Sequence, residues 1–328
     1  MQPKSIILFF YGYILFFRRH FSLTFAKEPN RPECIAPAQP GGGFDLTCKL
    51  IQVGMLKANI ISTPMRVTYM PGGVGVVAYN TMVNNRSKDG NVVVAFSSGT
   101  LLNIATGKHG KYNENNVKWL ASAGVDYGMI AVKSDSPYKN LEDLINALHK
   151  DPNSISIGAG GSIGGQDWMQ TALLAKTINI DVKKIRYVAF EGGGDALTSL
   201  LGNHIDVISA GIAELVPQIE TGTIRVLAIF SPKRLPGTLA NIPTAKELGY
   251  EVEWPVIRAY YMGAKVSDEA YNWWLDAFDK FQQTQEYKDQ LKQRSLFEFD
   301  KKGKELEDFV KKQTDQYRIL AKEFDLIK

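Results

Sequence analysis

The sequence predicts an α/β protein of two domains, and three observations support this prediction. Short runs rich in β-branched residues alternate with segments whose apolar residues recur at helical spacing, which is typical of α/β proteins with largely parallel sheets. The chain has 328 residues, whereas a single domain usually has roughly 100 to 200. Its composition, with 45% hydrophobic and 22% charged residues, is that of an ordinary globular protein.

The strands and helices follow from these two periodicities. The predicted strands cover residues 35–36, 66–69, 92–96, 129–132, 155–157, 207–208 and 225–229. The predicted helices cover residues 45–58, 74–84, 140–149, 166–177, 196–201, 267–283, 285–293 and 303–324. The last three helices are charged and amphipathic, so we expect them to pack on the outside of a sheet.

Residues 1–26 are predicted to be an export signal. An apolar run at 6–17 precedes two small residues, Thr24 and Ala26, that suit signal cleavage. The run is too short to cross a hydrocarbon core of about 30 Å. The arginine pair at 18–19 departs from the usual pattern, so an uncleaved anchor or a misassigned start codon stays open as an alternative.

The charge balance argues against a nucleic-acid-binding protein. The whole chain has 38 basic and 34 acidic residues, a formal charge of +4. Three of the bases and none of the acids lie in residues 1–26, so the remainder has 35 bases against 34 acids, or +1. A domain that binds nucleic acid by its phosphates usually carries a clear excess of basic residues. We therefore expect no nucleic-acid partner.

The two cysteines, Cys34 and Cys48, are close in sequence. In an exported protein such a pair can form a disulfide, and closing a loop of about 15 residues contributes about 3 kcal/mol by chain entropy. The alternative is two unrelated buried thiols. The spacing lacks the further ligands of a zinc site. We predict a disulfide and no metal.

Four glycine clusters each lie between a predicted strand and a predicted helix. Glycine lets backbone N–H groups face a ligand, and a helix N-terminus carries about half a positive charge. One such loop is merely a tight connection, our interpretation of the cluster at 71–75, but several together predict an anion-binding cradle. The clusters are residues 39–45, 71–75, 158–165 and 191–195.

Two enzyme motifs were compared with the glycine clusters, and neither has all the residues it requires at the required positions. Residues 160–164 match the G-x-S-x-G nucleophile elbow with Ser162 as nucleophile. Such a hydrolase needs a later acid and histidine, and His204 is the one histidine downstream. A dinucleotide fingerprint would need glycine where Ile163 stands. We predict no enzyme and no cofactor, with a Ser162 hydrolase as the alternative.

Other polar residues receive structural roles. Asp45 and Asp195 each close a glycine cluster, so we predict that they are helix N-caps. The three histidines after the signal, His109, His149 and His204, are predicted to lie at the surface or in turns.

Together the motifs resemble the periplasmic receptors of the tripartite tricarboxylate transporters, the Bug family. The match runs in the family's order from about residue 33 to the C-terminus, and the first stretch, with its cysteine pair, resembles the tricarboxylate-binding branch. The stretches that carry the resemblance are residues 34–48, 161–167, 191–195 and 242–250.

The resemblance implies a two-domain venus-flytrap fold of the type II periplasmic binding class, with the ligand cleft between the domains. One domain would comprise residues 33–133 plus 256–328, and the other residues 134–255. It implies a periplasmic receptor, which we expect to be a monomer, that captures a di- or tricarboxylate such as citrate. The receptor would deliver this ligand to a permease of a large and a small integral membrane subunit. An aromatic carboxylate or an acidic amino acid stays open as the ligand.

The resemblance also implies that the carboxylate is bound between two strand-to-helix loops, at 40–45 and 160–167, mostly by backbone amides, hydroxyls and water. Residues 98–100 and 191–194 would complete the cleft, and Trp168 stands where a polar residue is expected. The predicted ligand-binding residues are Gln39, Gly41, Gly42, Gly43, Phe44, Asp45, Ser98, Gly99, Thr100, Gly161, Ser162, Ile163, Gly164, Gln166, Asp167, Glu191, Gly192 and Gly193.

Overall fold

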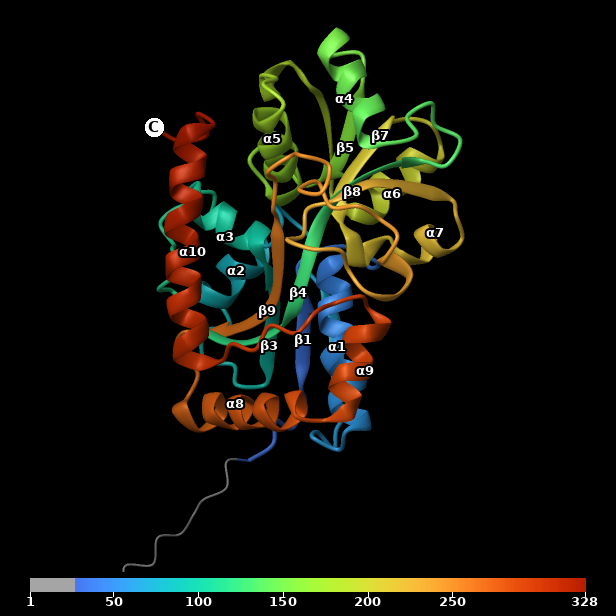
Figure 1. Cartoon of the computed structure of the whole chain (residues 1–328). Helices are drawn as coiled ribbons and strands as arrows, with labels where there is room; N and C mark the ends of the chain where they lie inside the picture. Colours follow the sequence, from blue (N-terminus) through green and yellow to red (C-terminus); the bar gives the residue numbers. More distant parts are fainter. Residues whose placement is uncertain (1–26) are drawn as a thin grey trace, which may run out of the picture.

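The structure, a computed structural model, describes residues 27–328, so the predicted export signal at 1–26 lies outside the described residues. Strands and helices alternate along the described chain, and the long strand β4 (Val117–Lys133) runs through the centre of the molecule (Figure 1). Within residues 27–328, no helix is both long enough and apolar enough to cross a membrane.

A mixed sheet forms the core, with strand order β2-β1-β3-β9-β4-β7-β5-β6 and with β8 also paired to β4. The strands β1, β2 and β3 are parallel to one another, as are β5, β6 and β7, but β4 and β9 (Pro255–Gly263) run antiparallel to their neighbours. The prediction of largely parallel sheets is therefore wrong at the centre. The other strands are β1 (Glu33–Ala36), β2 (Arg66–Tyr69), β3 (Val92–Ser97), β5 (Ser156–Gly160), β6 (Arg186–Phe190), β7 (Val207–Gly211) and β8 (Ile224–Ile229).

The strand β4 belongs to both halves of the sheet. Its residues 117–127 pair with β9, and its residues 128–132 pair with β7, while β8 pairs with residues 129–133. The chain crosses between the halves first along β4 and later along the segment that leads into β9. Along β4 the change of pairing partner, from β9 to β7, falls between residues 127 and 128. The domain limits at 133/134 and 255/256 stay a prediction.

Gly128 marks the crossing point. Its N–H donates to the Trp254 carbonyl at 2.9 Å, and its carbonyl accepts the N–H of Phe230 at 2.7 Å. A Cβ on Gly128 would lie 1.7 Å from Oε1 of the buried Gln170. Any larger residue here would have to displace that side chain, so glycine permits the close approach.

Helices cover both faces of the sheet, and α10 (Gly303–Glu323) runs along the side of the molecule against α3 and β4 (Figure 1). The helices α1, α8 and α9 pack on one face of the half that contains β1 and β3, as expected for the C-terminal helices. Besides α10, the α-helices are α1 (Gly43–Lys57), α2 (Val76–Asn84), α3 (Ser98–Ala105), α4 (Leu141–Lys150), α5 (Gln166–Thr177), α6 (Gly193–Leu201), α7 (Val216–Glu220), α8 (Asp268–Gln282) and α9 (Gln285–Gln293). The 3-10 turns are η1 (Val182–Lys184), η2 (Ile212–Glu214) and η3 (Gly237–Leu239).

The sequence did not predict α3, β6, β9 or the first part of β4. The region 98–100, expected at a strand end, begins α3: Ser97 caps this helix by accepting the Gly99 N–H at 3.2 Å, and Thr100 completes a capping box. Every residue of α3 is buried, and β9 is buried except for its first residue. An element buried on all sides shows no alternation of polar and apolar residues, so its period cannot be read from sequence.

The predicted N-cap role of the two aspartates is wrong. The N-caps of α1 and α6 are Gly42 and Gly192, which places Asp45 and Asp195 one turn inside their helices. The carboxylate of Asp45 accepts the Gly41 N–H at 2.8 Å and thereby closes the first glycine loop back on the helix.

His109 lies in a turn, as predicted, but its side chain is 2% exposed and is therefore buried rather than at the surface. The ring lies edge-on to Tyr79, with 4.7 Å between ring centroids. Burial lowers the pKa of His109 to about 4. The residue is therefore a neutral part of the core. His149 and His204 are exposed as predicted.

Cys34 and Cys48 form the predicted disulfide, with a Cα–Cα distance of 5.6 Å. Both residues are fully buried. The bond joins β1 to α1 and therefore anchors both ends of the first glycine loop, which lies between them in the chain.

We expect the double variant Cys34→Ser/Cys48→Ser to lose about 3 kcal/mol of unfolding free energy, because the bond closes a loop of about 15 residues in the unfolded chain. Denaturant unfolding measures this difference. Alkylation and intact mass should find no reactive thiol in the native parent before reduction. A loss below about 1 kcal/mol would contradict the expected contribution.

Candidate ligand-binding site

A cavity of about 50 Å³ lies where four helices begin. The N-caps of these helices are Gly42 for α1, Ser97 for α3, Gly165 for α5 and Gly192 for α6. Within the described chain the three glycines offer no side-chain cap to the first N–H groups of their helices. At the start of α1, the Gly43 N–H instead hydrogen-bonds the carboxylate of Glu214. The residues that line the cavity are Ala38, Gly42, Gly43, Phe44, Val74, Ser97, Gly160, Gly161, Gln166, Asp167, Glu191, Gly192, Gly193, Glu214 and Arg258.

All four predicted glycine clusters contribute to the lining of this cavity, although the cluster at 71–75 contributes Val74 and none of its glycines. The predicted site residues that line it are Gly42, Gly43, Phe44, Gly161, Gln166, Asp167, Glu191, Gly192 and Gly193. The predicted residues that lie outside its lining are Gln39, Gly41, Asp45, Ser98, Gly99, Thr100, Ser162, Ile163 and Gly164.

Several of the outlying residues have other partners. The Ser98 hydroxyl donates to the Pro255 carbonyl at 3.3 Å and accepts the Ile257 N–H at 3.2 Å, so it fastens α3 to β9. The Ser162 hydroxyl is exposed and accepts a hydrogen bond from Lys108 Nζ at 2.9 Å. These hydroxyls are occupied by protein contacts in this structure.

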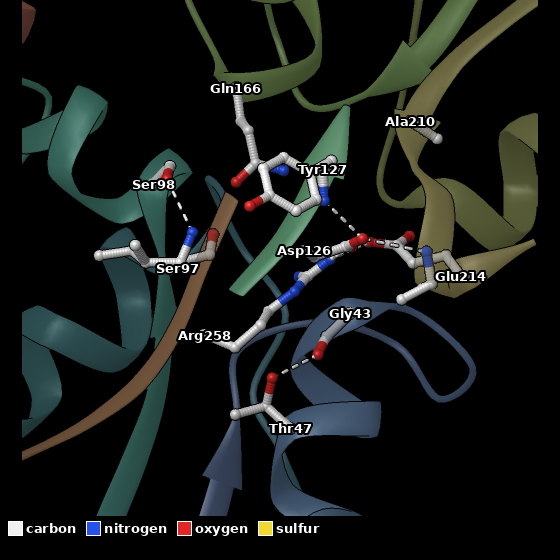
Figure 2. A network of polar contacts seen from close by, with 12 residues as sticks. Gly43, Thr47, Ser97, Ser98, Asp126, Tyr127, Gln166, Ala210, Glu214 and Arg258 are labelled. Carbon is white, nitrogen blue, oxygen red and sulfur yellow. Dashed lines mark hydrogen bonds and ion pairs between the residues drawn. The ribbon is translucent and has the colours of Figure 1, made fainter. Parts of the chain in front are cut away.

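A buried ion cluster that was not predicted from sequence forms one wall of the cavity (Figure 2). Arg258 Nη2 lies 2.8 Å from Asp126 Oδ2 and 2.9 Å from Glu214 Oε1. The side chains of Arg258, Asp126 and Glu214 are 2%, 0% and 10% exposed. Arg258 Nε has no hydrogen-bond partner within residues 27–328, which leaves one donor unused.

The charges of this cluster depend on one another. Burial opposes the charge of Arg258, but Glu214 and Asp126 outweigh it and raise the pKa of the guanidinium. Burial raises the pKa of Glu214 and of Asp126, and Arg258 opposes both shifts. The guanidinium therefore stays charged, and it holds two carboxylates in a place from which water is largely excluded.

The cluster also determines which residues fit beside it. A Cβ on Gly43 would lie 1.8 Å from Arg258 Nη1 and 2.6 Å from Glu214 Oε1. Asp126 in turn accepts the N–H groups of Tyr127 at 2.7 Å and Ala213 at 3.1 Å, which positions η2 against β4. The glycine at the start of α1 is thus required by a close approach rather than by a turn.

Asp167, near the start of α5, is a buried acid at the cavity. Its carboxylate accepts the Gly160 N–H at 3.2 Å and the Gln166 side-chain amide at 3.1 Å. Burial and then the charge of Glu214 raise the pKa of Asp167 to about 8. At neutral pH the protonated carboxyl can donate a hydrogen bond to an anionic ligand.

The sequence indicates only weakly that Arg258 and Asp126 belong to the site. Each is a charged residue within a strand of otherwise mostly apolar residues, and a fully buried charge is usually paired. The partners are 132 positions apart, so their pairing could not be read from spacing. Glu214 follows β7 directly and shows no pattern of its own.

This architecture defines a class of protein. An α/β molecule whose two sheet halves are joined by crossing strands, with helix N-termini around a cavity at the strand ends, has the venus-flytrap fold of periplasmic binding proteins, as predicted. Residues 49–326 match the tripartite tricarboxylate transporter family receptor, TctC. The chain belongs to this family, which confirms the resemblance seen in the sequence.

Similar proteins agree with this assignment. The UPF0065 protein in the gbd 5' region of Cupriavidus necator is 24% identical over 225 residues, which are 68% of this chain and 66% of that protein, slightly less than two thirds of its length. The solved structure of the periplasmic binding protein BugD has a TM-score of 0.83 at 19% identity and covers 91% of this chain and 99% of its own. MatC from Rhodopseudomonas palustris with bound malate has a TM-score of 0.78 at 17% identity, over 89% and 98% of the two chains. At these identities the two structures show the shared fold.

The raised pKa of Asp167 predicts a pH dependence of stability. The folded protein keeps this proton up to about pH 8, whereas the unfolded chain loses it near its ordinary value of about 3.9. Between these values the unfolded state binds fewer protons, so the stabilising contribution of this group falls as the pH rises. We expect the melting temperature of Asp167→Asn to fall less than that of the parent between about pH 5 and pH 8.

The control is Asp195→Asn, which changes an exposed carboxylate one turn into α6. It should keep the pH profile of the parent. Identical profiles for all three proteins would show that Asp167 does not hold a proton in the folded state.

Proposed function

We propose that the protein is an extracytoplasmic receptor that captures a di- or tricarboxylate such as citrate and delivers it to a permease of a large and a small membrane subunit. The convergence of four helix N-termini on one cavity carries this proposal, because exposed N–H groups and the positive ends of helix dipoles favour an anion. Arg258 and the protonated Asp167 add donors. Membership of the receptor family supports the transport role, and the malate bound to MatC supports a dicarboxylate ligand.

We further propose that the ligand enters when the two sheet halves separate about the crossing at Gly128. The cavity of about 50 Å³ is much smaller than an ordinary ligand site of roughly 300 to 1,000 Å³, so a whole tricarboxylate needs more room. The polar links across the cleft include Glu214 to Arg258, Gln166 to the Gly99 N–H at 3.1 Å, and Lys108 to Ser162. Water can replace each of these contacts on opening.

Reversible binding needs no chemistry from the site. The Ser162 hydroxyl lies outside the cavity lining, and its side-chain contact within residues 27–328 is to a lysine rather than a histidine. A nucleophile outside the cavity lining does not face a substrate bound within the cavity. The position of Ser162 supports a receptor over the hydrolase alternative.

Gly43 and Gly194 allow a matched test of the cradle. No described atom lies within 4 Å of a Cβ added to Gly194, which is exposed and outside the cavity lining, whereas a Cβ on Gly43 would displace Arg258. In calorimetry with citrate and malate, we expect the parent to bind and Gly43→Ala to lose roughly tenfold or more in affinity. Gly194→Ala should bind like the parent.

Thermal unfolding of the three proteins checks that each is folded before titration. Native mass spectrometry of the purified parent, searching for a small acid that copurifies, would identify the natural ligand. A folded parent that binds no di- or tricarboxylate would contradict the proposed function. Equal affinities for the two glycine variants would show that the Arg258 wall does not bind the ligand.

A further inference from the structure

Glu214 places its own carboxylate among the groups that would bind an anion (Figure 2). Its Oε1 lies 2.9 Å from Arg258 Nη2, and the Gly43 N–H at the start of α1 hydrogen-bonds the same carboxylate. Its Oε2 faces the start of α6 so closely that a Cβ on Gly193 would lie 2.3 Å away. A side chain of the protein thus occupies a position between one cation and two helix N-termini, where an anion is stabilised.

Glu214 reaches this position from the opposite half of the molecule. It ends η2, which follows β7, whereas Gly43 follows β1 and Arg258 lies on β9. The η2 turn is held firmly, because Asp126 accepts the Ala213 N–H at 3.1 Å. The carboxylate of Glu214 therefore bridges the two halves across the cavity.

The cavity cannot hold a ligand carboxylate beside that of Glu214. Among the described residues, the guanidinium of Arg258 on its wall already pairs with two carboxylates, those of Glu214 and Asp126. A further negative charge within a few ångströms would repel these groups where solvent screening is weak. The volume of about 50 Å³ leaves little room for both groups.

We propose that Glu214 is a built-in competitor for the ligand: it occupies the carboxylate subsite and clamps the halves together in the empty receptor, and the incoming acid displaces it. This inference rests on the proposed function. A ligand with one carboxylate makes only the contacts that Glu214 already makes, so its net free energy of binding is small. A di- or tricarboxylate adds contacts that Glu214 cannot make, so it binds even though it meets the same cost of displacing this side chain.

The first test compares Glu214→Ala and Glu214→Gln with the control Glu220→Gln, an exposed glutamate of α7. Calorimetry with citrate and with acetate should show affinities about tenfold to a hundredfold higher in Glu214→Ala, because the ligand no longer breaks a charge-assisted contact. The fold-gain should be similar for the two acids, because each of them displaces the same contact. Glu220→Gln should bind like the parent. Unchanged or weaker binding in both Glu214 variants would overturn the proposal.

The second test needs no ligand. Small-angle scattering of the empty proteins should give a larger radius of gyration for Glu214→Ala than for the parent and Glu220→Gln. Equal radii of gyration for Glu214→Ala and the parent would overturn the proposed clamp, whichever ligand the protein binds. An opened Glu214→Ala variant that binds none of the acids would support the clamp and overturn the proposed ligand, which separates the two hypotheses. Thermal unfolding confirms folding, and Glu214→Gln replaces Glu214→Ala if the latter does not fold.

Discussion

The guanidinium of Arg258, buried between Asp126 and Glu214, is the interaction on which the rest of the site depends. It joins β9, β4 and η2 at the place where the chain crosses between the halves of the sheet. Removing one member of such a cluster leaves an uncompensated buried charge, at a cost of about 3 to 5 kcal/mol. The three segments are therefore constrained to keep their relative positions as long as the cleft is closed.

This constraint explains the composition of the loops around the cavity. Gly43 and Gly193 have no side chain because the Arg258 and Glu214 side chains already occupy the space that a Cβ would need. The same absence of side chains exposes the first N–H groups of α1 and α6. Close packing against the ion cluster and backbone recognition of an anion therefore require the same residue type at the same positions.

A cradle of backbone dipoles suits a receptor that must release its ligand. In this structure, helix N-termini from both halves, such as those of α1 and α5, converge on the cavity. In the proposed opening they would separate, and a ligand held by both sets of N–H groups would lose one of them. The disulfide between Cys34 and Cys48 keeps the first of these helices in place on its strand. Binding strength then follows the distance between the halves, which opening can change without breaking a covalent bond.

Local sequence determined the alternation of strands and helices, the disulfide, and the glycine clusters that supply Gly42 to Phe44 and Gly192 to the cavity, since each depends on neighbouring residues. Tertiary structure alone decided the antiparallel course of β4 and β9 and the fully buried α3, because elements covered on all sides carry no period. It also decided the pairing of Arg258 with Asp126 and Glu214. Partners 132 and 44 positions apart meet only after the sheet has formed, and no spacing along the chain encodes that meeting.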